Sequence, residues 1–120
     1  MLKVPAISAQ YHYAGPVVIL VNKESGSASE LFSGIMQQYG RAVLIGTNTA
    51  GKVLLKSMFN FDDGSMLLLV TARGYLYNGA VFPFNGLTPD HIVSDDKMDL
   101  IRLAANYLKA QSYSKDEVQK

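Results

Sequence analysis

The sequence predicts an α/β fold, and three consecutive segments support that prediction. Residues 17–21 (VVILV) form a run that is apolar at every position, which is typical of a strand buried on both faces. A helical pattern follows, and then a second apolar run, 42–45 (AVLI). A strand, a helix and a strand within about 30 residues predict a βαβ unit, with parallel strands and a right-handed crossover.

The helix between these two runs is predicted from the spacing of its apolar side chains. After the polar stretch 22–29 (NKESGSAS), apolar residues recur every three or four positions, which places them on one face of an amphipathic helix. Gly40 is well placed for the left-handed conformation that often ends a helix. The predicted apolar face consists of Leu31, Phe32, Ile35, Met36 and Tyr39.

A β-hairpin is predicted in the second half of the chain. Residues 53–61 and 66–76 are rich in strand-forming side chains, and they flank the turn sequence DDGS at 62–65. The following stretch, 77–90, contains the glycines and prolines that are typical of a loop. A short strand is expected at 91–93.

A second amphipathic helix is predicted from about residue 97 to 110, with Asp95 or Asp96 as its N-terminal cap. The polar tail, 112–120, is expected to fray. The apolar side chains of this helix are Leu100, Ile101, Ala104, Tyr107 and Leu108.

The composition excludes several classes of protein. The chain has 120 residues, which suit one domain or part of a larger one, and a formal net charge of +1 without any basic block. Nucleic acid is therefore not expected as a partner. No cysteine is present, so disulfides, thiol nucleophiles and thiolate metal sites are excluded. No apolar stretch reaches the length of about 18 residues that a membrane span needs, and no metal or cofactor is predicted.

The stretch ESGSASE at 24–30 contains three serines and has two interpretations. Ser27 and Glu30 form the S-x-x-E pattern of a capping box, which satisfies backbone N–H groups at a helix start. Alternatively, Ser27 is a nucleophile at the positive end of the helix, where the backbone N–H of Ala28 would stabilise an oxyanion. The spacing of these residues favours capping without excluding catalysis.

A nucleophilic serine needs a base, and the chain offers two kinds. Neither His12 nor His91 has a spacing that indicates a catalytic triad or a metal site, and we expect both to be structural. Lys52 lies between a glycine and an apolar run. Burial there would lower its pKa from about 10.4 towards 7, at a cost of about 4 to 5 kcal/mol. A role for Lys52 as the base therefore depends on burial of its side chain. The loop GTNTAGK (46–52) is not a Walker A motif, because Val53 follows the lysine.

Several ordered motifs together resemble one family. The segment GPVVILVNKESGSASELFSGIMQQYGRAVLIGTNTAGK, followed by DDGS, TARGYLYNG and GLTPDHIV, is similar to the C-terminal processing peptidases, or tail-specific proteases. The resemblance covers roughly residues 14–95. It implies an α/β fold with a crotonase/ClpP-like core. It also implies a serine endopeptidase that cleaves proteins near their C-termini through an acyl-enzyme.

The resemblance assigns roles to particular residues. The family's nucleophile falls on Ser27, its general base on Lys52, and one oxyanion donor on the N–H of Ala28. Many relatives have a glutamine, thought to orient the lysine, where this chain has Lys56. A second ammonium there would favour the neutral form of Lys52 by repulsion, unless Lys56 points to solvent. Glu30 keeps its capping role.

The resemblance also sets expectations about the whole protein. A protein or peptide substrate is expected, a homo-oligomer is left open, and the family is usually extracytoplasmic, in the periplasm or cell envelope. The family's upstream D-L-R-x-N-x-G-G stretch and PDZ domain do not occur in residues 1–120, which therefore look like part of a protease catalytic domain with weak or no activity alone. Two alternatives are a non-catalytic ligand-binding module, like the retinoid-binding relatives, and a crotonase-like acyl-CoA enzyme.

Overall fold

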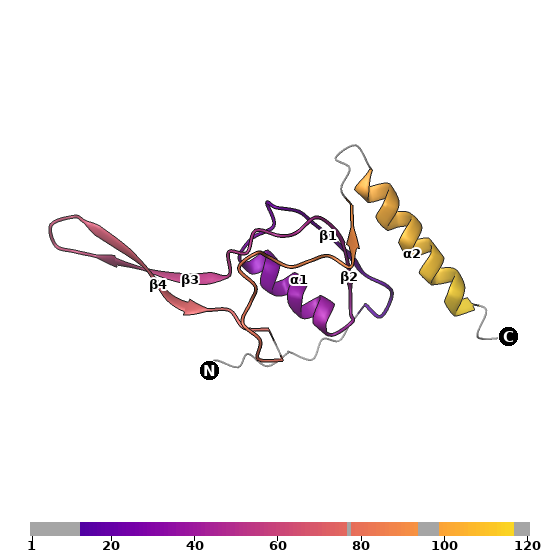
Figure 1. Ribbon diagram of the computed structural model, residues 1–120, viewed down its shortest axis with the longest axis horizontal. Helices are drawn as coiled ribbons and strands as arrows, with labels where there is room; N and C mark the ends of the chain where they lie inside the picture. Colours follow the sequence, from indigo (N-terminus) through magenta and orange to yellow (C-terminus); the bar gives the residue numbers. More distant parts are fainter. Residues whose placement is uncertain (1–12, 77, 94–98, 117–120) are drawn as a thin grey trace.

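The computed structural model describes residues 13–76, 78–93 and 99–116. Its centre is a three-stranded parallel sheet in the order β1 (Val18–Val21), β2 (Val43–Gly46) and β5 (His91–Ile92). Helix α1 (Ala28–Gln38) lies on one face of this sheet and α2 (Leu100–Asp116) on the other (Figure 1). The sheet is covered on both faces, which explains why the first two strands are so apolar. The α/β class and the parallel βαβ unit are confirmed.

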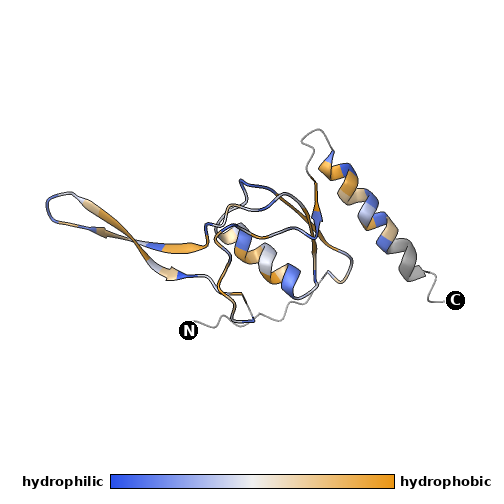
Figure 2. Cartoon of the chain, in the orientation of Figure 1, coloured by the Kyte–Doolittle hydropathy of each residue, from blue (hydrophilic) through white to orange (hydrophobic). Residues whose placement is uncertain are grey.

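The predicted hairpin is also confirmed, and it projects away from this body. Strands β3 (Leu54–Asn60) and β4 (Met66–Arg73) form an antiparallel two-stranded sheet of their own. The turn contains Gly64 with a φ of +81°, which a glycine adopts without strain. The hairpin extends the molecule to 71 Å along its longest axis (Figure 1). Because every residue of β4 is exposed, much of the hairpin's apolar surface (Figure 2) is uncovered.

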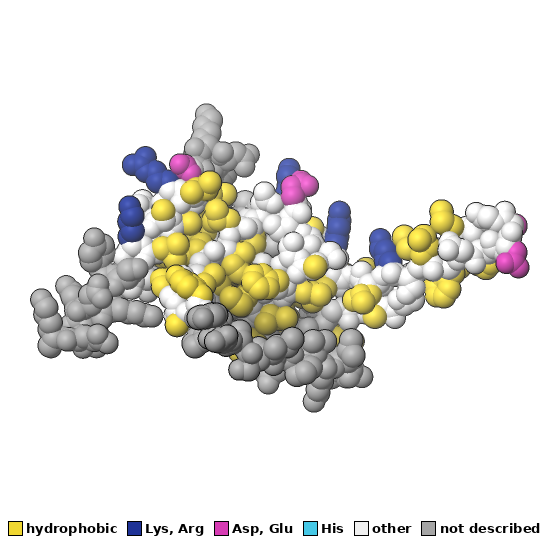
Figure 3. Space-filling view, turned by 180° about the vertical axis from the view of Figure 1, so that it is seen from behind, with side chains coloured by type: hydrophobic (Ala, Val, Ile, Leu, Met, Phe, Trp, Pro, Cys, Tyr) yellow, Lys and Arg dark blue, Asp and Glu magenta, His cyan; other side chains and the backbone are white. Residues whose placement is uncertain are grey.

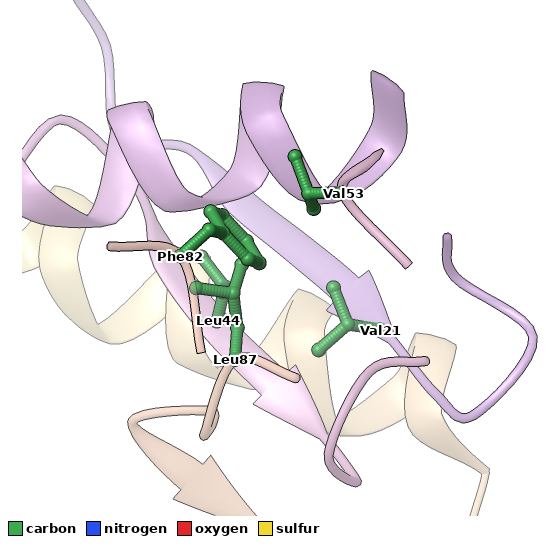
Figure 4. Packing of buried hydrophobic residues seen from close by; sticks show 5 residues of the cluster. All are labelled: Val21, Leu44, Val53, Phe82 and Leu87. Atoms are coloured by element: carbon green, nitrogen blue, oxygen red, sulfur yellow. The ribbon is translucent and has the colours of Figure 1, made fainter. Parts of the chain in front are cut away.

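The hydrophobic core lies between α1 and the sheet. Its buried residues come from β1, from β2 and from the loops on either side of the hairpin, so packing connects segments that are far apart in the sequence (Figure 4). Ile19, Leu31 and Leu76 pack against this cluster from its edge. The central cluster consists of Val21, Leu44, Val53, Phe82 and Leu87.

The buried face of α1 is not the predicted one. The helix buries Glu30, Ser33 and Gly34, whereas Phe32 and Tyr39 are each 57% exposed. A Cβ on Gly34 would lie 3.2 Å from Leu76, Phe82 and Leu87, so the glycine lets the helix approach this part of the core closely. The predicted apolar face was therefore wrong at Phe32, Ile35 and Tyr39, whereas Leu31 packs against the core cluster. Figure 3 shows that hydrophobic side chains gather on one face of the body and along the hairpin.

The end of α1 agrees with the expectation, whereas the bounds of α2 differ from it. Gly40 has a φ of +61° after α1, as predicted for a residue that ends a helix. Helix α2 runs to Asp116, beyond its predicted end. Its first turn is capped by Asp99, which accepts a hydrogen bond from the N–H of Arg102 at 3.1 Å. The predicted caps, Asp95 and Asp96, lie outside the described residues. Among the described helices, none is long and apolar enough to cross a bilayer.

Candidate active site

Ser27 lies at the sharp turn between the carboxyl end of β1 and the start of α1. Its backbone has φ +57° and ψ −118°, and it is the one described residue other than glycine with a positive φ. This conformation costs a residue with a Cβ about 1 to 3 kcal/mol, and such strain concentrates at functional sites. The side chain of Ser27 is exposed. The backbone geometry therefore distinguishes Ser27 from the other serines of this turn.

Ser25 has a structural role in the same turn. Its hydroxyl accepts a hydrogen bond from the N–H of Asn22 at 3.1 Å, and its carbonyl accepts one from the N–H of Ala50 at 2.9 Å. The second bond fastens the serine turn to the loop between β2 and β3. The local sequence gave no signal for this long-range contact.

The backbone N–H of Ala28 is placed as the first donor of α1. The next N–H groups, of Ser29 and Glu30, donate to the carbonyls of Gly26 and Ser27 at 3.2 and 3.1 Å. In the described part of the chain, no acceptor takes the N–H of Ala28. A helix begins with such unpaired donors, and they stabilise negative charge nearby.

Ser27 and Glu30 form the capping box that the sequence predicts. The Glu30 carboxylate supplies its stronger half, because Oε2 accepts the N–H of Ser27 at 3.0 Å. The N–H of Glu30 donates to the Ser27 carbonyl oxygen at 3.1 Å. The Ser27 hydroxyl lies near the Glu30 N–H but makes no capping hydrogen bond with it.

The Glu30 carboxylate also holds the loop that carries Lys52. Oε2 accepts the N–H of Lys52 at 2.8 Å, and Oε1 accepts the N–H of Gly51 at 2.6 Å and the hydroxyl of Thr49 at 2.5 Å. The side chain is fully buried, with 0% exposure. The S-x-x-E pattern predicts only the capping role of Glu30, and these three bonds have no signal in the local sequence.

The pKa of Glu30 lies below its ordinary value. Burial is the largest influence and would raise the pKa, because it penalises the charged form. The hydrogen bond from Thr49 and the backbone N–H bonds from Gly51, Lys52 and Ser27 together outweigh it. Glu30 is therefore a buried, ionised carboxylate.

In the loop between β2 and β3, the backbone passes so close to another segment that a glycine is required. Gly51 has a φ of +70°, and a Cβ there would lie 2.0 Å from the carbonyl oxygen of Phe84. Thr49 pairs with Leu87 through both backbone and side chain: its N–H donates to the Leu87 carbonyl, and its hydroxyl accepts the Leu87 N–H at 2.7 Å. These contacts fix the backbone directly before Lys52.

Lys52 and Ser27 line the same depression, whose volume is about 470 Å³. Lys56 lines it too. An adjoining hollow is lined by Ser27, Ala28 and the apolar start of β3. Lys52 is exposed. The described residues therefore do not provide the burial that a neutral lysine requires.

The remaining polar candidates lie outside this depression. His91 packs its ring against Tyr107, with ring centroids 5.5 Å apart, which agrees with the structural role expected of it. His12 lies outside the described residues. Asp90 was not singled out from the sequence, although it accepts the N–H of Leu44 at 2.8 Å and the Gln37 amide at 3.1 Å. No group of the described residues could hold a metal ion.

An exposed serine on a strained strand-to-helix turn is typical of hydrolases that form a covalent intermediate. Comparison with known proteins agrees with that class. The chain belongs to peptidase family S41, whose family model matches residues 3–93. The predicted membership of the C-terminal processing peptidase family is thus confirmed.

Curated relatives of the chain are named as C-terminal processing proteases. The chain is 36% identical over 81 residues to a carboxyl-terminal-processing protease of Picosynechococcus, covering 68% of this chain and 20% of that protein. It is 43% identical over 58 residues to the chloroplastic carboxyl-terminal-processing peptidase 3 of Arabidopsis thaliana, covering 48% of this chain and 11% of that one. The chain thus spans about a fifth or less of the length of these curated relatives.

Solved structures extend the likeness to the fold. The photosystem II D1 C-terminal processing protease is similar at a TM-score of 0.62 and 32% identity, over 67% of this chain and 21% of that one. The tricorn protease matches at a TM-score of 0.64 over 82% of this chain and 11% of that one. Its identity of 20% supports a shared fold alone.

Proposed function

We propose that Ser27 and Lys52 form the nucleophile and general base of a serine endopeptidase that cleaves proteins near their C-termini. The observation that carries this proposal is geometric. A strained, exposed serine and a lysine line one depression, and the unpaired N–H of Ala28 lies next to the serine. The sequences of the C-terminal processing relatives support the substrate class.

The proposed reaction is an acyl transfer in two halves. The Oγ of Ser27 attacks the scissile carbonyl carbon while the neutral Nζ of Lys52 takes the hydroxyl proton. The N–H of Ala28 donates to the developing oxyanion. The carbon–nitrogen bond then breaks, and Lys52 passes the proton to the leaving amine. Water attacks the Ser27 ester with Lys52 again as base, which releases the acid and restores the serine.

The exposure of Lys52 places a demand on the complete site. A general-base lysine must be uncharged, and desolvation is the main means of favouring that form. Because the described residues leave Lys52 exposed, we propose that bound substrate, together with further parts of the catalytic domain, covers the depression. Residues 1–120 alone should then turn over substrate weakly. Repulsion from Lys56 acts in the same direction as desolvation.

The wider assignments are proposals of the same kind. We propose that residues 1–120 are part of a crotonase/ClpP-like catalytic domain and that the protein works outside the cytoplasm. The likeness to solved proteases supports the first. For the second, one relative is named as chloroplastic, and the family resemblance points to the cell envelope.

Two substitutions test the proposed function in the protein. Ser27→Ala and Lys52→Ala should each abolish cleavage of an unfolded protein such as casein, with circular dichroism unchanged. Ser25→Ala is the matched control and should retain cleavage, because the Ser25 hydroxyl bonds only within its turn. Full activity in Ser27→Ala would contradict the proposal. Tight binding of a retinoid or acyl-CoA without any proteolysis would favour one of the alternatives.

A further inference from the structure

Glu30 connects the two segments that carry the proposed nucleophile and base. One carboxylate oxygen, Oε2, accepts the backbone N–H groups of Ser27 and Lys52 at 3.0 and 2.8 Å. These two residues are 25 positions apart in the sequence. A single buried atom therefore bridges the backbones on which both reacting side chains are mounted.

Capping of α1 does not account for this arrangement. A capping box needs Glu30 to accept the N–H of Ser27, which is one of its four hydrogen bonds. The other three donors, Thr49, Gly51 and Lys52, belong to the loop between β2 and β3. Because Glu30 is fully buried, water cannot replace the carboxylate as their acceptor. The unpaired donors would each cost about 1 to 3 kcal/mol.

We propose that Glu30 is a positioning residue, whose carboxylate holds the Ser27 turn and the Lys52 loop in the one relative placement that lets both side chains share the depression. This inference rests on the proposed roles of Ser27 and Lys52. Glu30 is buried and accepts bonds from backbone N–H groups and the Thr49 hydroxyl, so it acts through Ser27 and Lys52. Displacement of reacting groups by about 1 Å lowers rates by about 10²-fold.

Substitution by glutamine separates this role from simple capping. Each oxygen of Glu30 accepts two donors, one pair being Ser27 and Lys52 and the other Thr49 and Gly51. A glutamine keeps one oxygen and replaces the other by an NH₂ group, which cannot accept an N–H. Glu30→Gln therefore loses the acceptor of one pair and loosens at least one of the two segments.

The test measures the rate at which a fluorophosphonate phosphonylates Ser27, followed by mass spectrometry of the purified protein. In this reaction the Oγ–P bond forms, fluoride leaves, and the serine proton goes to Lys52. We expect Glu30→Gln to lower the maximal rate about 10²-fold with little change in the concentration for half-maximal rate. Amide hydrogen exchange should speed up at Ser27, Gly51 or Lys52. Thr49→Val removes one of the four donors to Glu30 and should lower the phosphonylation rate by a smaller factor. This variant tests the inference if Glu30→Gln does not fold.

Asp90→Asn provides the matched control. Asp90 also accepts a backbone N–H, that of Leu44, but it reaches neither the serine turn nor the lysine loop. We expect it to change stability while leaving phosphonylation within about two-fold of wild type. A wild-type rate in folded Glu30→Gln, or an equal loss in Asp90→Asn, would overturn the inference alone. Failure of Ser27 to react in the wild-type protein would overturn the proposed function itself, and the inference with it.

Discussion

The carboxylate of Glu30 and the hydroxyl of Thr49 form a buried hydrogen bond of 2.5 Å. Thr49 accepts a second bond from the N–H of Leu87 at 2.7 Å, so its hydroxyl continues the polar network from the helix to the loop after the hairpin. Every buried polar side-chain atom of the described residues has a hydrogen-bond partner. This network joins three segments that are distant in the sequence: the start of α1, the loop before β3 and the loop after the hairpin.

Replacement of Thr49 by valine should therefore be strongly destabilising. The change keeps the shape of the side chain but removes a donor to Glu30 and an acceptor for Leu87. We expect the free energy of unfolding to fall by about 1 to 3 kcal/mol, because buried polar groups lose their partners. Urea denaturation measures this change. Thr49→Ser keeps the hydroxyl and should lose clearly less; equal losses would show that the methyl group, not the hydroxyl, matters.

The strain at Ser27 predicts an unusual order of stability among its variants. Glycine adopts positive φ without a Cβ penalty, whereas alanine retains the strain. We expect Ser27→Gly to unfold at a higher urea concentration than Ser27→Ala, with a difference of about 1 kcal/mol. Ser29→Gly compared with Ser29→Ala is the control. Ser29 lies inside the helix, so there alanine should be the more stable. If alanine were the more stable residue at both sites, Ser27 would be unstrained.

The lowered pKa of Glu30 predicts a dependence of stability on pH. The carboxyl binds protons more readily in the unfolded chain, where its pKa is near the ordinary value of 4.5. Its contribution is therefore complete above that value and is lost as the pH falls through the lower folded pKa. We expect the difference in unfolding free energy between the wild type and Glu30→Gln to shrink from pH 7 to pH 3. A difference that stays constant would contradict an ionised Glu30.

Much of the fold could be predicted from the sequence because its signals are local. The apolar run that became β1, the turn around Gly64 and the glycine after α1 each determine the backbone near them. The buried face of α1 could not be predicted in this way. Apolar side chains surround that helix broadly, and the choice of Gly34 and Glu30 for burial depends on the close approach of Phe82 and Leu87, which are distant in the chain.

The candidate site also has parts that the sequence predicts and parts that it does not. Ser27, Lys52 and the N–H of Ala28 are predicted as site groups because their residue types match the family's ordered motifs. The network around Glu30 was missed, since the S-x-x-E spacing already had a sufficient local explanation. The sequence left the burial of Lys52 open. Val53, which follows it, is buried in the core, whereas Leu55 is exposed on the hairpin.

The most direct measurement of the central claim is the site of acylation in ESGSASE. The protein is mixed with an activated ester, quenched with acid within seconds and digested, and the acyl group is located by fragment mass spectrometry. The account predicts the acyl group on Ser27 in the wild type and none there in Lys52→Ala. Acylation of Ser25 or Ser29 in place of Ser27, or undiminished acylation of Ser27 in Lys52→Ala, would contradict it.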